Sequence, residues 1–339
     1  MQGKSSDTAG EAGSNGFERA GTRERNLGLE LVRVTEAAAH AAARYMGRGD
    51  KEAVDQAAVD AMRAAMDGVD MDGLVVIGEG EKDEAPMLYI GERVGNGLHP
   101  EVDVAVDPVD GTRLTAMGLP GAIAVVAVAD RGSMYAAPPG VYYMEKLAVG
   151  RVAAGVIDLD APIVENLARI GQATDTPIRD ITVTVLDRPR HADIIKQIRE
   201  AGARIRLIQD GDVAAAIQAT MEDYQAVDVY MGIGGAPEAV LAAAAIKCVG
   251  GQMLCRVWPR NEEERTKLLG EGVDLQRVYG VDDLITSQNV SFAATGITTG
   301  EVLRGVRYTS TGARTHSVMM RGRTGTVRYI EAVHSWKRH

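Results

Sequence analysis

Two aspartates lie three residues apart in VAVDPVDGTRL, residues 104–114, where an apolar run meets a turn. Asp107 and Asp110 put two carboxylates on this turn, and Gly111 and Thr112 follow with backbone N–H groups. Hard carboxylate oxygens suit Mg²⁺ or Mn²⁺, which commonly take one or two carboxylates together with water and phosphate oxygens. A simple strand-ending turn uses the same residue types. The turn by itself therefore fits a cation site or an ordinary turn.

A second acidic cluster favours the cation site. The stretch IGEGEKDEAP holds four acids in six residues, Glu79, Glu81, Asp83 and Glu84. A charge run is usually a solvated loop. Glu79 differs from its neighbours because it follows an apolar run and a glycine directly, so we expect it at a strand end. A strand-end glutamate together with the Asp107 turn is harder to explain as two ordinary loops.

Glu238 follows the glycine-rich run MGIGGAP and has two interpretations. Pro237 and Glu238 fit an ordinary helix start, and Glu238 also offers another carboxylate at a strand end. The run has no GxGxxG register, and no acidic residue is suitably placed on a following strand. We therefore set a nicotinamide-dependent enzyme aside.

Two basic groups are equally open to interpretation. Lys51 and Asp55 lie four residues apart on a predicted helix, which is typical of a surface ion pair. Arg188 and Arg190 flank a proline after the apolar run ITVTVLD. Two arginines at a strand end suit bidentate phosphate recognition, and a solvent-facing basic turn would have the same sequence.

The spacing of the aspartates also excludes one phosphatase chemistry. Haloacid-dehalogenase-type enzymes use Asp-x-Asp-x-Thr, in which the first aspartate is the nucleophile, whereas this chain has Asp-x-x-Asp-Gly-Thr. We therefore interpret Asp107 and Asp110 as metal ligands and expect water to be the nucleophile.

The elements that would position these residues follow from hydrophobic periodicity. Apolar spacing predicts helices over residues 26–46 and 52–66. The runs GLVVI, VDVAVD and AIAVVAVAD predict buried strands, the second ending at Pro108 because proline lacks an N–H. After Pro177 strands and helices alternate, which predicts a mostly parallel sheet covered by helices. Ligands bind such sheets beyond the carboxyl ends of the strands, where 187–190, 210–212 and 234–238 fall.

The same pattern suggests a division into segments. Residues 1–24 are rich in Gly, Ser and charge and are expected to be disordered. We place a metal-binding α/β domain at 25–177 and an α/β substrate-binding domain at 178–339, the latter ending in a β-hairpin.

Composition restricts the class of protein. The 339 residues include 37 Lys+Arg and 47 Asp+Glu, a formal net charge of −10, which argues against nucleic-acid or acidic-membrane partners. Cys248 and Cys255 have no zinc-type spacing and are expected to be reduced thiols. The sequence has no signal-peptide pattern and no apolar run long enough to span a bilayer, so we expect a cytoplasmic protein.

Several stretches in one order carry a family resemblance. GRGDKEAVDQAAVDAMR, VVIGEGEKDEAPMLYIGE, VAVDPVDGTRLTAMG, YYMEKLAVG, RPRHADII, DGDVAAAI and GIGGAPE resemble the class II fructose-1,6-bisphosphatases, including those that also act on sedoheptulose 1,7-bisphosphate. The resemblance covers residues 26–336. DPVDGT alone implies only the wider lithium-sensitive, metal-dependent phosphatase superfamily, which includes inositol monophosphatases.

The resemblance implies a layered α-β-α-β-α sandwich and two divalent cations, Mg²⁺ or Mn²⁺. One cation would be held by Asp55 and Glu79, the other by Asp107, Asp110 and Glu238. The catalytic step is assigned to Thr112, Asp83 and Lys51, with the Thr112 hydroxyl orienting or deprotonating water. The residues expected to contact substrate are Asp110, Gly111, Thr112, Tyr143, Arg188, Pro189, Arg190, Asp210, Gly211, Asp212 and Gly235.

We therefore expect a phosphoric monoester hydrolase that removes the 1-phosphate of fructose 1,6-bisphosphate. Sedoheptulose 1,7-bisphosphate is a further candidate substrate. The alternatives are a broader, inositol-monophosphatase-like enzyme and a non-catalytic phosphosugar sensor. A homo-oligomer, dimer or tetramer, is expected.

Overall fold

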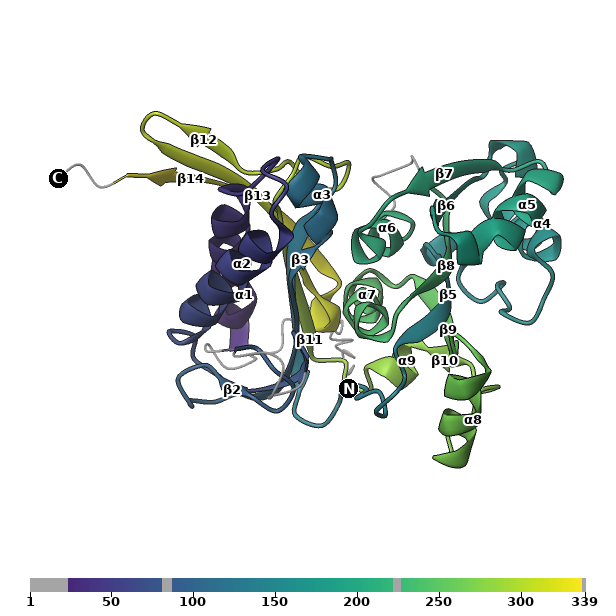
Figure 1. The fold of residues 1–339 in the computed structure, drawn as a ribbon, viewed down its shortest axis with the longest axis horizontal. Helices are drawn as coiled ribbons and strands as arrows, with labels where there is room; N and C mark the ends of the chain where they lie inside the picture. Colours follow the sequence, from purple (N-terminus) through teal and green to yellow (C-terminus); the bar gives the residue numbers. More distant parts are fainter. Residues whose placement is uncertain (1–23, 81–86, 222–226, 337–339) are drawn as a thin grey trace, which may run out of the picture.

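Helices and sheets alternate in five layers in the computed structural model, which describes residues 24–80, 87–221 and 227–336 (Figure 1). Within these residues two long helices cover an eight-stranded sheet, a helical layer follows, and a six-stranded sheet is covered by further helices on its far face. The predicted layered α/β fold is therefore confirmed. Of the predicted tail, residues 1–23 lie outside the described residues, and Glu24 begins the first helix.

The first sheet gathers strands from both ends of the chain. Its order is β12-β13-β11-β4-β3-β1-β2, with β14 paired to β13, and β1–β3 is its one parallel pair among the described strands. The strands are β1 (Asp72–Ile77), β2 (Arg93–Val94), β3 (Glu101–Asp110), β4 (Ile123–Asp130), β11 (Val290–Gly296), β12 (Arg307–Thr309), β13 (Gly312–Arg321) and β14 (Thr326–Ser335).

Helices cover both faces of this sheet. On one face lie α1 (Glu24–Ala43) and α2 (Lys51–Met66), close to the predicted bounds. The Asp50 side chain starts α2 by accepting the Ala53 N–H at 3.0 Å. On the other face lie α6 (Asp212–Gln218) and α7 (Ala236–Val249). Strand β4 is therefore buried at every residue except its last, as its unbroken apolar sequence predicts.

Strand β3 does not end at Pro108, contrary to the prediction. Asp110 still pairs with Ile123 of β4, and the register shifts between Asp107 and Asp110. An irregularity of this kind leaves residues without ladder hydrogen bonds, so the missing N–H of Pro108 costs the sheet no bond. The strand therefore continues while its last residues leave the regular pairing.

The middle layer is thin because its long helix is rich in alanine. The sequence of α7 includes four consecutive alanines, 242–245, and all four are buried. A helix that is apolar on all sides is typical of a position between two packed surfaces. Its small side chains let both sheets approach it closely, with the helix start at the site described below.

The second sheet has the order β10-β9-β5-β8-β6-β7. Its strands are β5 (Tyr143–Val149), β6 (Thr182–Leu186), β7 (Arg204–Ile208), β8 (Val229–Gly235), β9 (Gln252–Val257) and β10 (Tyr279–Gly280). The remaining helices are α3 (Thr112–Met117), α4 (Ile163–Thr174), α5 (Ala192–Glu200), α8 (Glu262–Gly270) and α9 (Val281–Leu284), with short 3₁₀ turns at 151–153, 178–180, 189–191 and 322–324.

This sheet is mixed, and the prediction of a mostly parallel sheet was wrong. Strand β6 is parallel to β7 and β8, whereas β5 pairs antiparallel with both β8 and β9. The alternation of strands and helices along the chain was correct. Strand β9 does run in the direction of β8, as a crossover helix requires, but β5 from an earlier part of the chain is inserted between them.

Sheet membership also differs from a division at residue 177. Strand β5 lies before that point and joins the second sheet, whereas β11 to β14 lie after it and join the first. The predicted C-terminal hairpin exists, since β13 and β14 pair from Gly312–Ser335 to Arg321–Thr326, but it extends the first sheet. The chain therefore passes from the first sheet to the second and back.

Two further sequence expectations can be compared with the structure. Cys248 and Cys255 are both buried and unpaired, and burial raises the pKa of each thiol to about 12. None of the described helices combines the length and the apolar character needed to cross a bilayer.

Candidate active site

An acidic pocket of about 320 Å³ lies where β3 ends and α6 and α7 begin. Its walls come from the ends of β1, β3 and β7 and from the first turns of three helices. Parts of the chain far apart in sequence thus bring carboxylates to one place. The carboxylates that line the pocket are Glu79, Asp107, Asp110, Asp210, Asp212 and Glu238.

The aspartates of the 107–112 turn are held by backbone donors. Asp107 accepts the Val109 N–H at 2.9 Å, which closes the turn on itself. Asp110 accepts the Ala214 N–H at 3.1 Å, so the first turn of α6 is tied to the end of β3. The two carboxylates therefore have fixed positions although they belong to an irregular part of the strand.

Thr112 links the acidic pocket to α2. Its hydroxyl donates to Asp55 Oδ1 at 2.7 Å, across 57 residues of sequence, and lies 3.3 Å from the Val109 carbonyl oxygen. This hydrogen bond places the Asp55 carboxylate next to a hydroxyl that lines the pocket. The i, i+4 spacing of Lys51 and Asp55 did not reveal this partner.

Glycines at the start of α7 make room for two of the acids. A Cβ on Gly235 would lie 1.8 Å from Glu238 Oε2, and a Cβ on Gly234 would lie 1.8 Å from Asp212 Oδ2. Glu238 Oε2 is buried and has no hydrogen-bond partner among the described residues. The glycine-rich run thus lets two carboxylates lie against the backbone. Its glycines make room for these acids, whereas those of a dinucleotide-binding motif make room for a pyrophosphate.

Burial makes the ionised state of these acids unfavourable. Loss of solvent, and then the charges of neighbouring carboxylates, raise the pKa values of Asp107, Asp110 and Glu238 above the usual range. Glu79 is more accessible, but partial loss of solvent around its carboxylate and the charges of Asp55 and Glu238 raise its pKa to about 7. The pocket therefore favours a bound positive charge.

An arginine-lined pocket of about 450 Å³ adjoins the acidic pocket. The two share four lining residues, Asp210, Asp212, Pro237 and Glu238. Arg188, Arg190 and Arg260 supply positive charge at the second pocket, and Tyr142 and Tyr143 supply its aromatic wall. Acidic and basic subsites therefore lie side by side.

The turn that carries Arg188 and Arg190 is held in place by His191, which is buried. Its Nδ1 lies 2.7 Å from the Leu186 carbonyl oxygen at the end of β6, and its Nε2 accepts the Ile233 N–H of β8 at 2.7 Å. Nδ1 must therefore be the protonated nitrogen, and the ring is neutral. Burial lowers the pKa of His191. One imidazole thus fastens the turn at 189–191 to two strands.

The three arginines differ in how far their donors are already used. Arg190 donates through Nε and Nη2 to the Ile233 carbonyl oxygen, at 3.0 and 2.8 Å, and lies 5.0 Å from the Tyr143 ring centroid. Arg260 forms an ion pair with Glu264. Among the described residues, Arg188 makes only a long ion pair of 3.9 Å with Asp210 and a hydrogen bond to the Asp187 carbonyl oxygen. Arg188 therefore keeps the most donors for a ligand.

Most predicted site residues lie around these two pockets. Tyr143 and Gly235 face each other across the β5–β8 ladder, and both line the arginine-lined pocket. Gly211 instead lines a neighbouring cavity, Pro189 is exposed outside the pockets, and Lys51 is exposed on α2. The predicted Asp83 lies outside the described residues.

Arg260 lines the second pocket, and neither this residue nor Lys146 was among the predicted site residues. Lys146 is buried and donates from Nζ to Asp212 Oδ2 at 2.8 Å, and the Tyr230 hydroxyl donates to the same oxygen at 3.3 Å. Arg260 lies in WPR, which carries no recognisable signal. Lys146 could have been noticed, because a lysine inside the apolar run of a strand needs a buried acid as its partner.

The carboxylates of the pocket are not arranged as a complete set of metal ligands. Within the described residues no group of three or more His, Cys, Asp or Glu side chains converges closely enough to hold a metal ion. Backbone and hydroxyl donors engage Asp55, Asp107 and Asp110 instead. The oxygen-only donor set, the buried and unpartnered Glu238 Oε2 and the mutual repulsion of the acids nevertheless fit hard divalent cations.

A family model for the bacterial fructose-1,6-bisphosphatases, glpX-encoded, matches residues 25–334. The chain belongs to this family. A class 2 fructose-1,6-bisphosphatase of Haemophilus influenzae is 46% identical over 323 residues, covering 91% of this chain and 96% of that protein. Fructose-1,6-bisphosphatase 1 class 2 of Escherichia coli K12 is also 46% identical, covering 91% and 95%.

These matches confirm the predicted family resemblance and the classification as a bisphosphatase. A solved structure described as an extragenic suppressor from Pyrococcus furiosus matches 57% of this chain and 68% of its own, at 16% identity and a TM-score of 0.29. At that score the likeness supports no conclusion.

Replacing Gly235 by alanine should displace the Glu238 carboxylate without unfolding the bisphosphatase. We expect the concentration of Mg²⁺ or Mn²⁺ that gives half-maximal activity to rise about 10- to 100-fold, the usual effect of disturbing a residue that supports a metal ligand. Gly68→Ala is the matched control, because an added Cβ there meets nothing within 4 Å. An unchanged metal requirement in Gly235→Ala would show that Glu238 does not depend on this glycine.

His191 should make stability depend on pH. Its folded-state pKa is lowered, so below about pH 6.5 the unfolded chain takes up a proton that the folded chain resists. The free energy of unfolding should therefore fall as the pH decreases through this range, and His191→Gln should remove that component. Urea unfolding at pH 5, 6 and 7 measures it, with exposed His99→Gln as the control. Equal pH slopes for the native and His191→Gln proteins would contradict the assignment.

Proposed function

We propose that this family member hydrolyses the 1-phosphate of fructose 1,6-bisphosphate to fructose 6-phosphate and inorganic phosphate. The supporting observation is that an acidic pocket and an arginine-lined pocket share a wall. A substrate with a phosphate at each end needs two anion sites, one that receives cations and one that supplies arginines. Asp210 lies between them and can accept hydrogen bonds from sugar hydroxyls.

The acidic pocket is the proposed site of cleavage. Two cations, Mg²⁺ or Mn²⁺, would be held by Asp55 and Glu79 and by Asp107, Asp110 and Glu238. When bound, they would lower the pKa of water and neutralise charge on the phosphate. Carboxylates that are buried and repel one another are suited to this role, because cations relieve both costs.

Thr112 is the proposed proton acceptor for the attacking water. Its hydroxyl already donates to Asp55 at 2.7 Å, so its oxygen lone pairs remain available toward the pocket. A water oriented by Thr112 can pass a proton to the hydroxyl while the hydroxyl proton moves toward Asp55. The reacting phosphate would also meet the backbone N–H groups at Gly111 and Thr112, which adds positive potential to the site.

The far phosphate is proposed to bind in the arginine-lined pocket. Arg188 has the most available donors, while Arg190 shapes the pocket by holding the end of β8. A second basic subsite is not needed by an enzyme that acts on any small monoester, which disfavours an inositol-monophosphatase-like specificity. Sedoheptulose 1,7-bisphosphate has the same pattern of two terminal phosphates, and a substrate panel measured in both metals separates these possibilities. The homo-oligomer and the cytoplasmic location stay predictions.

Thr112→Ala should lower kcat by about 10²- to 10⁴-fold, the range for loss of a positioned proton-transfer group. The KM for fructose 1,6-bisphosphate should change little, because the acids and the phosphate subsite remain. Thr112→Ser is the matched control, since it keeps the hydroxyl and should retain most activity. A kcat close to native in Thr112→Ala would show that the residue only packs the turn.

Arg188→Ala should lower kcat/KM for fructose 1,6-bisphosphate by about 10- to 150-fold, as expected for loss of one charge-assisted contact. Slow hydrolysis of p-nitrophenyl phosphate should be nearly unchanged, because that small monoester does not reach the arginine-lined pocket. Arg179→Ala, at an 81% exposed side chain outside both pockets, is the control. Proportional loss with both substrates would instead place Arg188 at the reacting phosphate.

Chelation of divalent cations should abolish phosphate release, and addition of Mg²⁺ or Mn²⁺ should restore it. The reason is that the uncompensated acids of the pocket would repel a phosphate dianion. Phosphate release after exhaustive treatment with EDTA, followed by addition of each metal, measures the requirement. Full activity in the chelated protein would refute a metal-dependent mechanism and leave the family assignment intact.

A further inference from the structure

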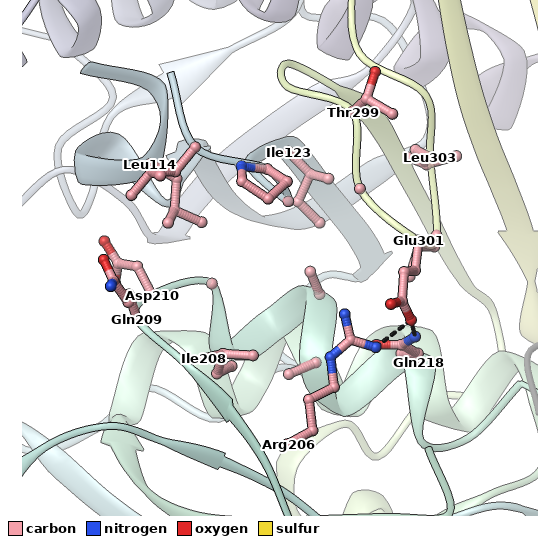
Figure 2. Close-up of a pocket in the computed structure, with 18 of the residues that line it drawn as sticks. Leu114, Ile123, Arg206, Ile208, Gln209, Asp210, Gln218, Thr299, Glu301 and Leu303 are labelled. Atoms are coloured by element: carbon pink, nitrogen blue, oxygen red, sulfur yellow. Dashed lines mark hydrogen bonds and ion pairs between the residues drawn. The ribbon is translucent and has the colours of Figure 1, made fainter. Parts of the chain in front are cut away.

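A third cavity, of about 450 Å³, lies behind the segment that carries Asp210 and Gly211 (Figure 2). Its walls come from the α3–β4 connection, the end of β7, the side of α6 and the segment 299–303 that follows β11. The cavity therefore lies between the part of the molecule built on the first sheet and the part built on the second. Only Asp210 is shared with the two pockets of the candidate active site. Its volume is within the range of small-molecule sites.

The middle of this cavity is apolar. Leu114, Ile123 and Leu303 form one side of the cavity, and all three are buried residues. Figure 2 shows them across from Ile208 and the helix α6. An apolar enclosure of this kind favours the carbon skeleton of an organic ligand over an inorganic ion.

One end of the cavity is polar and charged. Glu301 accepts hydrogen bonds from both Arg206 and Gln218, as the dashed lines in Figure 2 indicate. Arg206 uses Nη1 for this bond, and within the described residues its Nε and Nη2 donors have no protein acceptor. The Arg206 side chain is 35% exposed. Arg206 balances the charge of Glu301, and the neutral Gln218 amide adds a second hydrogen bond to that carboxylate. The Nε and Nη2 hydrogens of Arg206 can still donate to the oxygens of an anionic group that binds beside this pair.

The cavity is connected to the acidic pocket through α6. Ala214, Ala215 and Gln218 of this helix line the cavity, while the Ala214 N–H donates to Asp110 at 3.1 Å. Before the helix, Gly211 has a positive φ of 84°, a backbone conformation that favours glycine, and this turn leads directly into the first turn of α6. A ligand that presses on α6 therefore acts on the position of Asp110.

Arg206 and Glu301 also join the two sheets. Arg206 belongs to the edge strand β7 of the second sheet, and Glu301 follows β11 of the first. A ligand that binds Arg206 would change the strength of the ion pair between Arg206 and Glu301. Its occupancy would thus change how the two halves, and the acids drawn from each, lie against one another.

From these contacts we infer that the cavity is a second ligand site, for an organic anion with an apolar body. The charged head binds Arg206, the apolar body packs against Leu114, Ile123 and Leu303, and α6 transmits binding to Asp110. This site is additional to the proposed substrate site and does not depend on which sugar bisphosphate is hydrolysed.

The probe for the test is 8-anilinonaphthalene-1-sulfonate, which combines aromatic rings with one anionic group. Titration of the full-length native enzyme should give one saturable fluorescence increase per chain, and saturating inorganic phosphate should not compete. Arg206→Gln should weaken binding about tenfold or more, as for loss of a charge-assisted hydrogen bond. Arg204→Gln, two residues earlier on the same strand and outside the cavity, is the matched control and should bind normally.

A second variant removes the space instead of the charge. Leu119 lines the cavity and is half-buried, so Leu119→Trp should fill the cavity and prevent binding while the thermal unfolding midpoint stays near the native value. Bound probe should change the KM or kcat for fructose 1,6-bisphosphate in the native enzyme, and Arg206→Gln should show this change only at higher probe concentration.

Three results would overturn the inference. They are the absence of saturable binding, equal affinity in the native, Arg206→Gln and Leu119→Trp proteins, and displacement by inorganic phosphate. Saturable binding that leaves both kinetic constants unchanged would refute the coupling through α6. Because binding is read by fluorescence, failure of the proposed bisphosphatase activity would not be mistaken for failure of this site.

Discussion

Negative charge crowded into a pocket with little water is the constraint on which the rest of this structure depends. Asp107, Asp110 and Glu238 are each less stable as anions than free carboxylates because burial and mutual repulsion oppose ionisation. The fold compensates only partly, with the Val109 and Ala214 N–H groups as donors. The remaining negative charge favours binding of positive charge, and metal-dependent bisphosphatases supply it with divalent cations.

The layered fold makes this crowding possible. Acids reach the pocket from the first sheet through the ends of β1 and β3, and from the second sheet through the starts of α6 and α7. Neither sheet carries the whole set. Because α7 is rich in alanine, the two sheets lie close enough for these ends to meet, and Gly234 and Gly235 remove the last steric obstacle. The close packing of the middle layer is therefore what brings the acids of the site together.

The proposed basis of substrate specificity lies in a different part of the same interface. The arginine-lined pocket shares Asp210 and Asp212 with the acidic pocket, and buried Lys146 holds Asp212 in place. His191 fastens the arginine turn to β6 and β8 without carrying charge itself. Neutral and paired groups thus position this pocket, while Arg188 at its wall keeps donors that are not used within the described residues. The cavity behind α6 extends this interface further, since its lining again comes from both sheets.

The sequence by itself determined the local chemistry and most elements. Apolar periodicity predicted α1, α2, β4 and the alternation from β6 to α7, because periodicity depends on neighbours in the chain. For the same reason the motifs indicated the family and predicted acids that line the pocket. Pairing depended on distant residues. The insertion of β5 between β8 and β9, the return of β11 to β14 to the first sheet and the continuation of β3 through Pro108 were decided only by tertiary packing. The same holds for the Thr112–Asp55 hydrogen bond, the Lys146–Asp212 pair and the different roles of Arg188 and Arg190, because each joins residues that only the folded chain brings together.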